Sequence, residues 1–378
     1  MVNDLHTNLL KYLAIIGLVP YMIRSNGQRK QKREQQQQHV QYLVAFKQHH
    51  YQHQHQQQRH RQRQHQRQPI SNHHNRTLRW QQIYTGALIA INMITTLFGV
   101  IFLPFEDTLF VTNVVSIIVF LVQIAVVNSI LLETMLTYKK YCELLNNYQR
   151  VQTLMKQLLQ IQLCKREIRQ RQWRKYSFYI MIVYGSLLAT ATVISTNYYC
   201  GYFWYALLAI FTIRTRSIQI TLYMDYIVYY LELFNIKLKA LVSCKLYKNY
   251  TLLDIDYKHL ESFEYLSNVK YVYQEIYALH EKYNELYGQS LVSIYTVIVL
   301  DIIIHVYWTF LTLFEYYKTY FMYKTISSLT ALFTILFMLC YTGEQCEKQV
   351  KVLLTYQIGL ECTNHLCCFF SYSRALWF

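Results

Sequence analysis

Six apolar stretches, each long enough to cross a lipid bilayer, constrain this chain more than any other feature of its sequence. A spanning helix needs about 20 mostly apolar residues, and 53% of the chain is hydrophobic against 15% charged. Backbone polar groups in lipid must be paired internally, so apolar runs without strand alternation indicate helices. We therefore predict an all-α, polytopic membrane protein with six recognisable spans. The expected spans are Ile83–Leu103, Phe110–Leu132, Ser177–Tyr198, Tyr202–Tyr230, Ser290–Phe314 and Met322–Tyr341.

Positive charge is concentrated in alternate loops. Residues 1–82 hold 13 of the 37 Lys and Arg, 134–176 hold 10 and 235–287 hold 7, whereas 104–109 and 199–201 hold none. Since Lys and Arg bias short loops toward the cytoplasm, this pattern predicts a cytoplasmic N-terminus. The formal charge of +16 is then explained by topology, and it does not indicate a nucleic-acid-binding face.

The two long basic connections have a helical pattern. Apolar residues recur at three- and four-residue spacing in 134–175, and 258–287 shows the same pattern. We expect these helices to extend the spans past the membrane and to pack together there. The apolar stripe of the first connection is Leu144, Tyr148, Val151, Met155 and Leu158.

The N-terminal region combines a short apolar element with a low-complexity tract. Leu9–Met22 is too short to span and is interrupted by Pro20, so it is expected to form an interfacial helix. Gln28–Gln68 is a Gln/His/Arg repeat that holds 7 of the 14 His. Nothing in it sets the spacing of a metal site, so we interpret it as a disordered insertion.

Motifs of enzyme chemistry are absent from the sequence. It contains no Walker loop, HExxH, GxSxG or zinc-spaced Cys pair. We therefore predict no catalytic residue, no cofactor, no metal and no enzymatic activity.

Polar residues within the spans are costly in lipid and are candidates for function. Arg214, Arg216, Asp225 and Asp301 are expected to form an intramembrane polar network. Asp301 and His305 share one helix face at i,i+4. Arg214 is expected either to pair with Asp301 or to extend toward the interface, and packing and ligand-binding roles both stay open.

Candidate ligand-binding residues occupy the outer halves of their spans. With 37 Tyr in the chain, packing or an interfacial position is an alternative role for any single tyrosine. The candidates are Tyr198, Trp204, Tyr205, His305, Tyr307, Trp308, Tyr323 and Ser327.

Several segments carry a family resemblance. They are "GLVP" before the first span, "IRTRSIQITLYMDYIVYYLELFNIKL", "YQEIYALHEKYNELYGQSLVSIYTVIVLDIIIHVYW" and "CYTGEQCEKQVKVLL". With the predicted topology, they make the chain resemble the insect gustatory receptors over about residues 8–25 and 80–360.

The resemblance implies a ligand-gated, non-selective cation channel subunit in a homo- or hetero-tetramer, surrounded by membrane lipid. It implies an outer-leaflet pocket for a tastant or contact pheromone, and a place in the plasma membrane of sensory-neuron dendrites. An insect odorant receptor is the first alternative. A transporter or a G-protein-coupled receptor is the second, although D/E-R-Y, NPxxY and internal repeats are absent.

The C-terminal region departs from the family pattern. Thr355-Tyr356 begins like the family's terminal signature, but Glu361 and Cys362 stand where Gln-Phe is expected. Relative to the family pattern the pore-lining seventh helix is then missing, so we expect a C-terminally truncated chain that conducts no ligand-evoked current when it is expressed alone. The expected organisation is an N-terminal segment (1–27), the disordered insertion (28–79), the six-helix receptor domain (80–341), the start of a cytoplasmic anchor helix (342–361) and an atypical tail (362–378).

Overall fold

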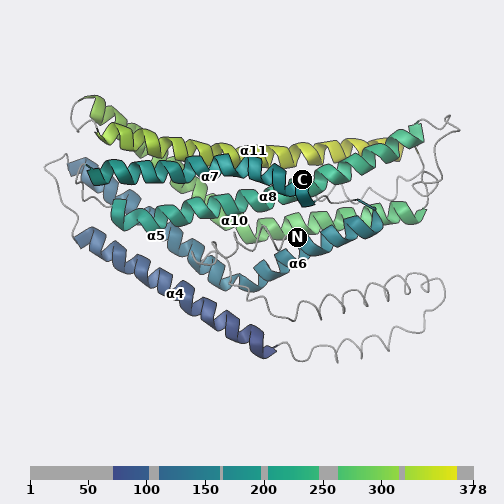
Figure 1. The fold of residues 1–378 in the computed structure, drawn as a ribbon, viewed down its shortest axis with the longest axis horizontal. Coiled ribbons are helices and arrows are strands. Elements are labelled where there is room, and N and C mark those ends of the chain that lie inside the picture. The colour runs from purple at the N-terminus through teal and green to yellow at the C-terminus, as the bar shows by residue number, and fades with distance from the viewer. Residues whose placement is uncertain are drawn as a thin grey trace.

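The computed structural model describes residues 71–101, 110–161, 165–196, 203–246, 263–314 and 320–363. Within these ranges the chain forms seven helices and no strand, which confirms the all-α prediction, and the helices run roughly along one long axis (Figure 1). Leu9–Met22, the Gln/His/Arg repeat and residues 364–378 lie outside the described residues. The helices are α4 (Ser71–Ile101), α5 (Phe110–Leu136), α6 (Tyr138–Leu158), α7 (Lys165–Thr196), α8 (Phe203–Leu246), α10 (Phe263–Leu313) and α11 (Tyr320–Thr363).

Five of these helices are long and apolar enough to cross a membrane, namely α4, α5, α7, α10 and α11. The remaining expected span, Tyr202–Tyr230, lies in α8, where Arg214, Arg216 and Gln219 interrupt the apolar run. Residues 212–223 of α8 are all buried. The polar side chains of α8 therefore face protein, where partners can offset the cost of removing them from water.

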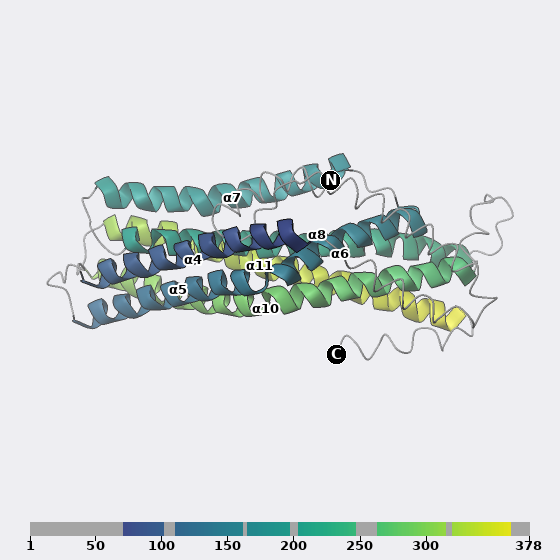
Figure 2. The same cartoon turned by 90° about the horizontal axis from the view of Figure 1, so that it is seen from below.

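The α8 helix occupies the centre of the bundle. It contacts α11, α10, α5 and α4, whereas α7 packs chiefly against α11. Figure 2 shows α7 along one edge of the bundle, with α4 and α5 on the side away from α11 in Figure 1. A helix surrounded in this way can carry buried polar groups only if each finds a partner.

Four helices extend beyond the apolar spans at one end of the bundle. α6 packs against the N-terminal part of α10, beside the C-terminal parts of α8 and α11 (Figure 1). Of the predicted stripe, Leu144, Tyr148, Val151 and Met155 are buried. The apolar face of α6 is therefore satisfied by packing within the chain, as the helical pattern predicted.

Two boundaries differ from the expected organisation. α4 begins at Ser71, before the expected boundary at residue 80, because residues 71–79 already continue the helix of the first span. α11 runs without a break to Thr363, so residues 342–361 continue the last apolar helix in the same direction.

Buried tyrosine hydroxyls join α6 to α8. The Tyr148 hydroxyl donates to the Tyr223 carbonyl at 2.8 Å, and the Tyr141 and Tyr223 hydroxyls lie 2.6 Å apart. Tyr148 also contacts the rings of Tyr226 and Tyr230. Burial raises the pKa of Tyr148 well above its usual value, so its hydroxyl keeps its proton and remains a donor.

We predict that Tyr148→Phe lowers the free energy of unfolding by about 1–2 kcal/mol, because the Tyr223 carbonyl loses a buried donor. Tyr323→Phe is the control, since Tyr323 is 64% exposed. Thermal unfolding of the purified protein in detergent measures both changes. Equal melting temperatures for the two variants would contradict the role of the Tyr148 hydroxyl.

Candidate functional site

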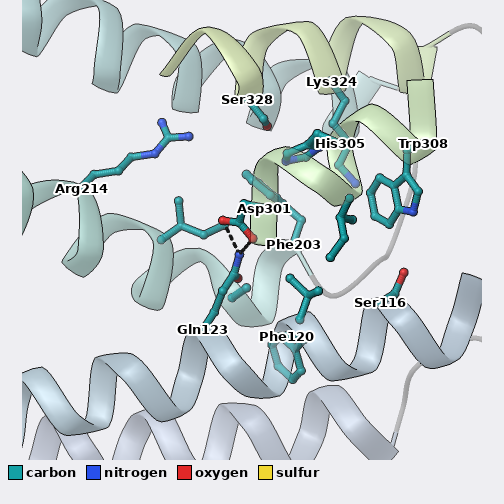
Figure 3. A pocket seen from close by; sticks show the side chains of 14 residues that line it. Ser116, Phe120, Gln123, Phe203, Arg214, Asp301, His305, Trp308, Lys324 and Ser328 are labelled. Carbon is teal, nitrogen blue, oxygen red and sulfur yellow. Dashed lines mark hydrogen bonds between the residues drawn. The ribbon is translucent and has the colours of Figure 1, made fainter. Parts of the chain in front are cut away.

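A cavity of about 80 Å³ lies among α5, α8, α10 and α11. Figure 3 shows polar and aromatic side chains from these helices converging on it. A concave site with a mostly apolar wall and a few convergent polar groups is typical of small-molecule binding. Its lining consists of Ser116, Val119, Phe120, Gln123, Phe203, Ala206, Ile210, Arg214, Asp301, Ile304, His305, Trp308, Lys324 and Ser328.

The inner part of the cavity contains a carboxylate held by an amide. Gln123 on α5 donates its Nε2 to both carboxylate oxygens of Asp301 on α10, at 2.8 and 2.9 Å (Figure 3). This contact joins two helices across the cavity wall.

Arg214 reaches the same cavity from α8 but bonds to α7. Its Nη1 donates to the Val183 carbonyl at 2.6 Å and to the Ser186 hydroxyl at 3.1 Å. Within the described chain it forms no ion pair with Asp301, although both line the cavity. The structure thus brings Arg214 and Asp301 to one site and gives them different partners.

The other end of the cavity gathers a cation, an imidazole and an indole. Lys324 lies with its Nζ 4.4 Å from the centroid of the Trp308 ring, a cation–π geometry. His305 meets Trp308 edge-on at 6.0 Å. Nδ1 of His305 is buried without a hydrogen-bond partner in the described part of the chain. A buried ring nitrogen of this kind can bond to a molecule that enters the cavity.

The other candidate ligand residues surround the cavity without lining it. Trp204 is exposed and packs edge-on against Phe203, which does line the cavity. The Ser327 hydroxyl donates to the Ser186 carbonyl. Tyr205 and Tyr307 are half-buried, Tyr323 is exposed, and Tyr198 lies outside the described residues. Of the seven candidates within the described residues, the cavity therefore brings together His305 and Trp308.

A second buried polar centre surrounds Arg216, where α5, α8 and α10 meet. The guanidinium donates to Gln219 at 3.0 Å and to the Ser290 hydroxyl at 3.1 Å, and it lies 4.7 Å from the centroid of the Tyr287 ring. Glu133 accepts a hydrogen bond from Ser290 and lies 3.7 Å from Arg216. The side chains of Arg216 and Glu133 are 2% and 10% exposed.

Asp225 belongs to a third group. Its carboxylate pairs with Lys175 of α7 at 2.5 Å, and the same ammonium lies 5.2 Å from the centroid of the Tyr341 ring. The four residues expected in one intramembrane network therefore occupy three separate clusters along the bundle. Each cluster joins a different set of helices.

Sequence reasoning missed several residues that line the cavity. Lys324 lies near the start of the expected span Met322–Tyr341 and was not considered among the polar residues of the spans, but it is 6% exposed within α11. Gln123 was overlooked, although an amide in the middle of the apolar α5 is itself a signal of a buried polar contact. Ser116, Phe120 and Ser328 carry no such signal, because serines and aromatic residues are common throughout the spans.

We predict that Arg216→Met lowers the free energy of unfolding by about 3–5 kcal/mol, because it leaves the Glu133 carboxylate buried without its cation. Lys282→Met is the matched control. Lys282 lies 3.7 Å from Glu143, the same distance that separates Arg216 from Glu133. The side chains of Lys282 and Glu143 are 42% and 64% exposed, so this pair is in contact with solvent. The control should cost less than about 1 kcal/mol.

Adding Glu133→Gln to Arg216→Met should recover part of the lost stability, since the carboxylate charge is removed as well. Thermal unfolding in detergent gives the coupling between the two sites. Strictly additive losses would contradict a direct Arg216–Glu133 interaction.

Comparison with known proteins gives a family match over most of the chain. The family described as "7tm Chemosensory receptor" matches residues 9–356. The chain is also 28% identical over 288 residues to a Drosophila melanogaster protein named "Putative gustatory receptor 39b", which covers 75% of each chain. Because the family match spans most of the sequence, the resemblance read from the segments above is confirmed. This chain belongs to the 7tm chemosensory receptor family.

Proposed function

We propose that this chain is a subunit of a ligand-gated, non-selective cation channel that detects a small-molecule tastant or contact pheromone in the cavity. The cavity carries the proposal, because it combines an apolar and aromatic wall with Asp301, His305, Arg214 and Lys324. Such a wall can bury the apolar part of a ligand while a few polar groups fix its orientation. Membership of a chemosensory receptor family supports the same function.

The proposed orientation places the N-terminus in the cytoplasm of a sensory-neuron dendrite, in a plasma-membrane tetramer. The distribution of Lys and Arg supports it, because the basic connections lie at the end of the bundle where α6 and the N-terminal part of α10 pack. The cavity residues of α10 lie toward the opposite end of that helix. The cavity then opens toward the outer leaflet.

One helix connects the proposed ligand site to the end of the bundle where the helices extend beyond the apolar spans. α10 runs unbroken from Phe263 to Leu313, and it carries Asp301 and His305 in the cavity and Ser290 in the Arg216 centre. A ligand that binds one arrangement of α10 more tightly than another would shift the equilibrium between them. A change at the cavity is thereby transmitted along α10 to the Arg216 centre and to α6, which packs on α10.

We predict that His305→Ala raises the half-effective concentration of an activating ligand by roughly tenfold or more, because the ligand loses a buried hydrogen-bond partner. The chain is expressed in cells with a second family member, and a panel of tastants is screened by calcium entry. Ile303→Ala is the matched control on the same helix, since Ile303 is 58% exposed.

Surface expression is measured for both variants, so a folding defect is separated from a binding defect. An unchanged concentration–response curve for well-expressed His305→Ala would reject the cavity as the ligand site. A loss in Ile303→Ala as large as that in His305→Ala would reject it too.

We further predict that Gly99→Ala weakens the response to bulky ligands more than to small ones. A Cβ at Gly99 would lie 2.9 Å from the Phe120 ring and 3.1 Å from Tyr205 Cβ. The Phe120 ring would shift toward the cavity that it lines. Gly86→Ala on the same helix is the control, because its Cβ would meet nothing within 4 Å.

The measurement is the half-effective concentration for a homologous series of ligands of increasing size. Parallel shifts across the series, or equal effects of the two alanine variants, would contradict the steric account.

A further inference from the structure

The first turns of α7 carry an unusual density of positive charge at the edge of an apolar helix. Residues 165–175 contain six Lys or Arg and one Glu, and the candidate membrane span Gln170–Thr196 begins within them. Clusters of four to eight basic residues beside a spanning helix are a signature of anionic-lipid binding. The contacts of each cation decide whether the charge is already neutralised by the protein.

Of the cations whose side chains are described, Arg171 and Lys175 are paired with α8. Arg171 bonds to Glu232 at 2.5 Å and lies 5.6 Å from the centroid of the Tyr229 ring. Lys175 pairs with Asp225 at 2.5 Å. These two contacts fasten α7 to the central helix, and among the described side chains of this segment Arg174 forms no ion pair.

Within one helical turn, the outward face of α7 changes from tryptophan and arginine to purely apolar side chains. Phe178 and Met181 are each 62% exposed, as is typical of side chains that face lipid tails. Directly before them, Trp173 is 70% exposed and Arg174 is exposed. Tryptophan concentrates at the level of lipid headgroups, so this turn marks the membrane surface.

Helix register adds further cations to the same face. Arg166 precedes Arg174 by two helical turns, and Arg169 precedes Trp173 by one, so both positions continue the outward side of α7. Figure 2 shows α7 along the edge of the bundle, where its outward side is turned away from the other helices. A lipid beside α7 can therefore reach Trp173 and Arg174 together.

We propose that the outward face of α7 around Trp173 and Arg174 binds the headgroup of an anionic phospholipid, with basic residues at helix positions 166 and 169 adding to the local positive charge. The Arg174 guanidinium pairs with the phosphate and carboxylate oxygens of the headgroup, a geometry that arginine forms bidentately. The Trp173 indole lies at the boundary between headgroup and acyl chain, and Phe178 and Met181 contact the acyl chain. The partner is a lipid of the leaflet into which α7 enters.

Binding to this face is coupled to the receptor core through α8. Arg171 and Lys175 flank Trp173 and Arg174 on the same helix, and they pair with Glu232 and Asp225 of α8, which also carries Arg214 in the cavity. An anionic lipid on α7 thus stabilises the segment that fixes the central helix. Loss of the bound lipid should therefore lower the thermal stability of the receptor.

The test uses the full chain purified in a neutral detergent and fluorescent phosphatidylserine as the probe, with phosphatidylcholine of the same acyl chains for comparison. We expect saturable binding of phosphatidylserine that weakens with added salt, and little displacement by phosphatidylcholine. Equal affinity for the two lipids would overturn the proposal. This result is independent of the cavity, because no tastant is present.

The variant Arg166→Gln/Arg174→Gln should weaken phosphatidylserine binding by roughly ten- to thirtyfold. The control, Lys139→Gln/Lys156→Gln, removes the same charge from exposed positions of α6 and should change affinity less than about twofold. If the α7 cations serve only to orient the chain in the membrane, the two double variants bind alike, and the proposal fails. Arg174→Gln alone, at an exposed site, gives the same comparison if the double variant unfolds.

Discussion

Burial of the polar residues of α8 is the constraint on which the rest of the bundle depends. Arg216 is 2% exposed, and a guanidinium removed from water is tolerated only with hydrogen-bond acceptors and a counter-charge. Glu133, Ser290 and Gln219 supply them from α5, α10 and α8 itself. The positions of three helices are therefore fixed relative to one another at this level. The same rule explains why α8 must occupy the centre.

The cavity follows from this arrangement. α5 and α10, which meet α8 at the Arg216 centre, also bound the cavity, and there Gln123 and Asp301 join them again. Arg214 lines the space between them, and its own hydrogen bonds go to α7. The polar groups that make the cavity suited to a ligand thus also hold its walls together. A ligand that competes for one of them would change helix contacts as well as fill space.

Much of the architecture was predictable from the sequence, for physical reasons that differ between elements. The spans were predictable because a helix that crosses lipid must be long and apolar. The α6 helix was predictable because Leu144 and Tyr148 begin an apolar stripe at helical spacing, which is stable only when it is buried against other helices. Asp301 and His305 were recognised because helix geometry relates residues four apart. Lys324 and Gln123 meet them only through packing of separate helices, and no spacing within one helix encodes that. The Val183 carbonyl, which accepts a hydrogen bond from Arg214, is a backbone group. Every residue has such a group, so the sequence does not indicate which one is used.

The central claim is that a small molecule activates this receptor by occupying the cavity among α5, α8, α10 and α11. Protection of an introduced thiol tests it most directly: Ser328→Cys places the thiol on the cavity wall, and Lys282→Cys places one in the extension as the reference. An activating ligand should slow the reaction of a small thiol reagent at Ser328→Cys by roughly tenfold at saturation and leave Lys282→Cys unchanged. Activation without protection at Ser328→Cys would contradict the account.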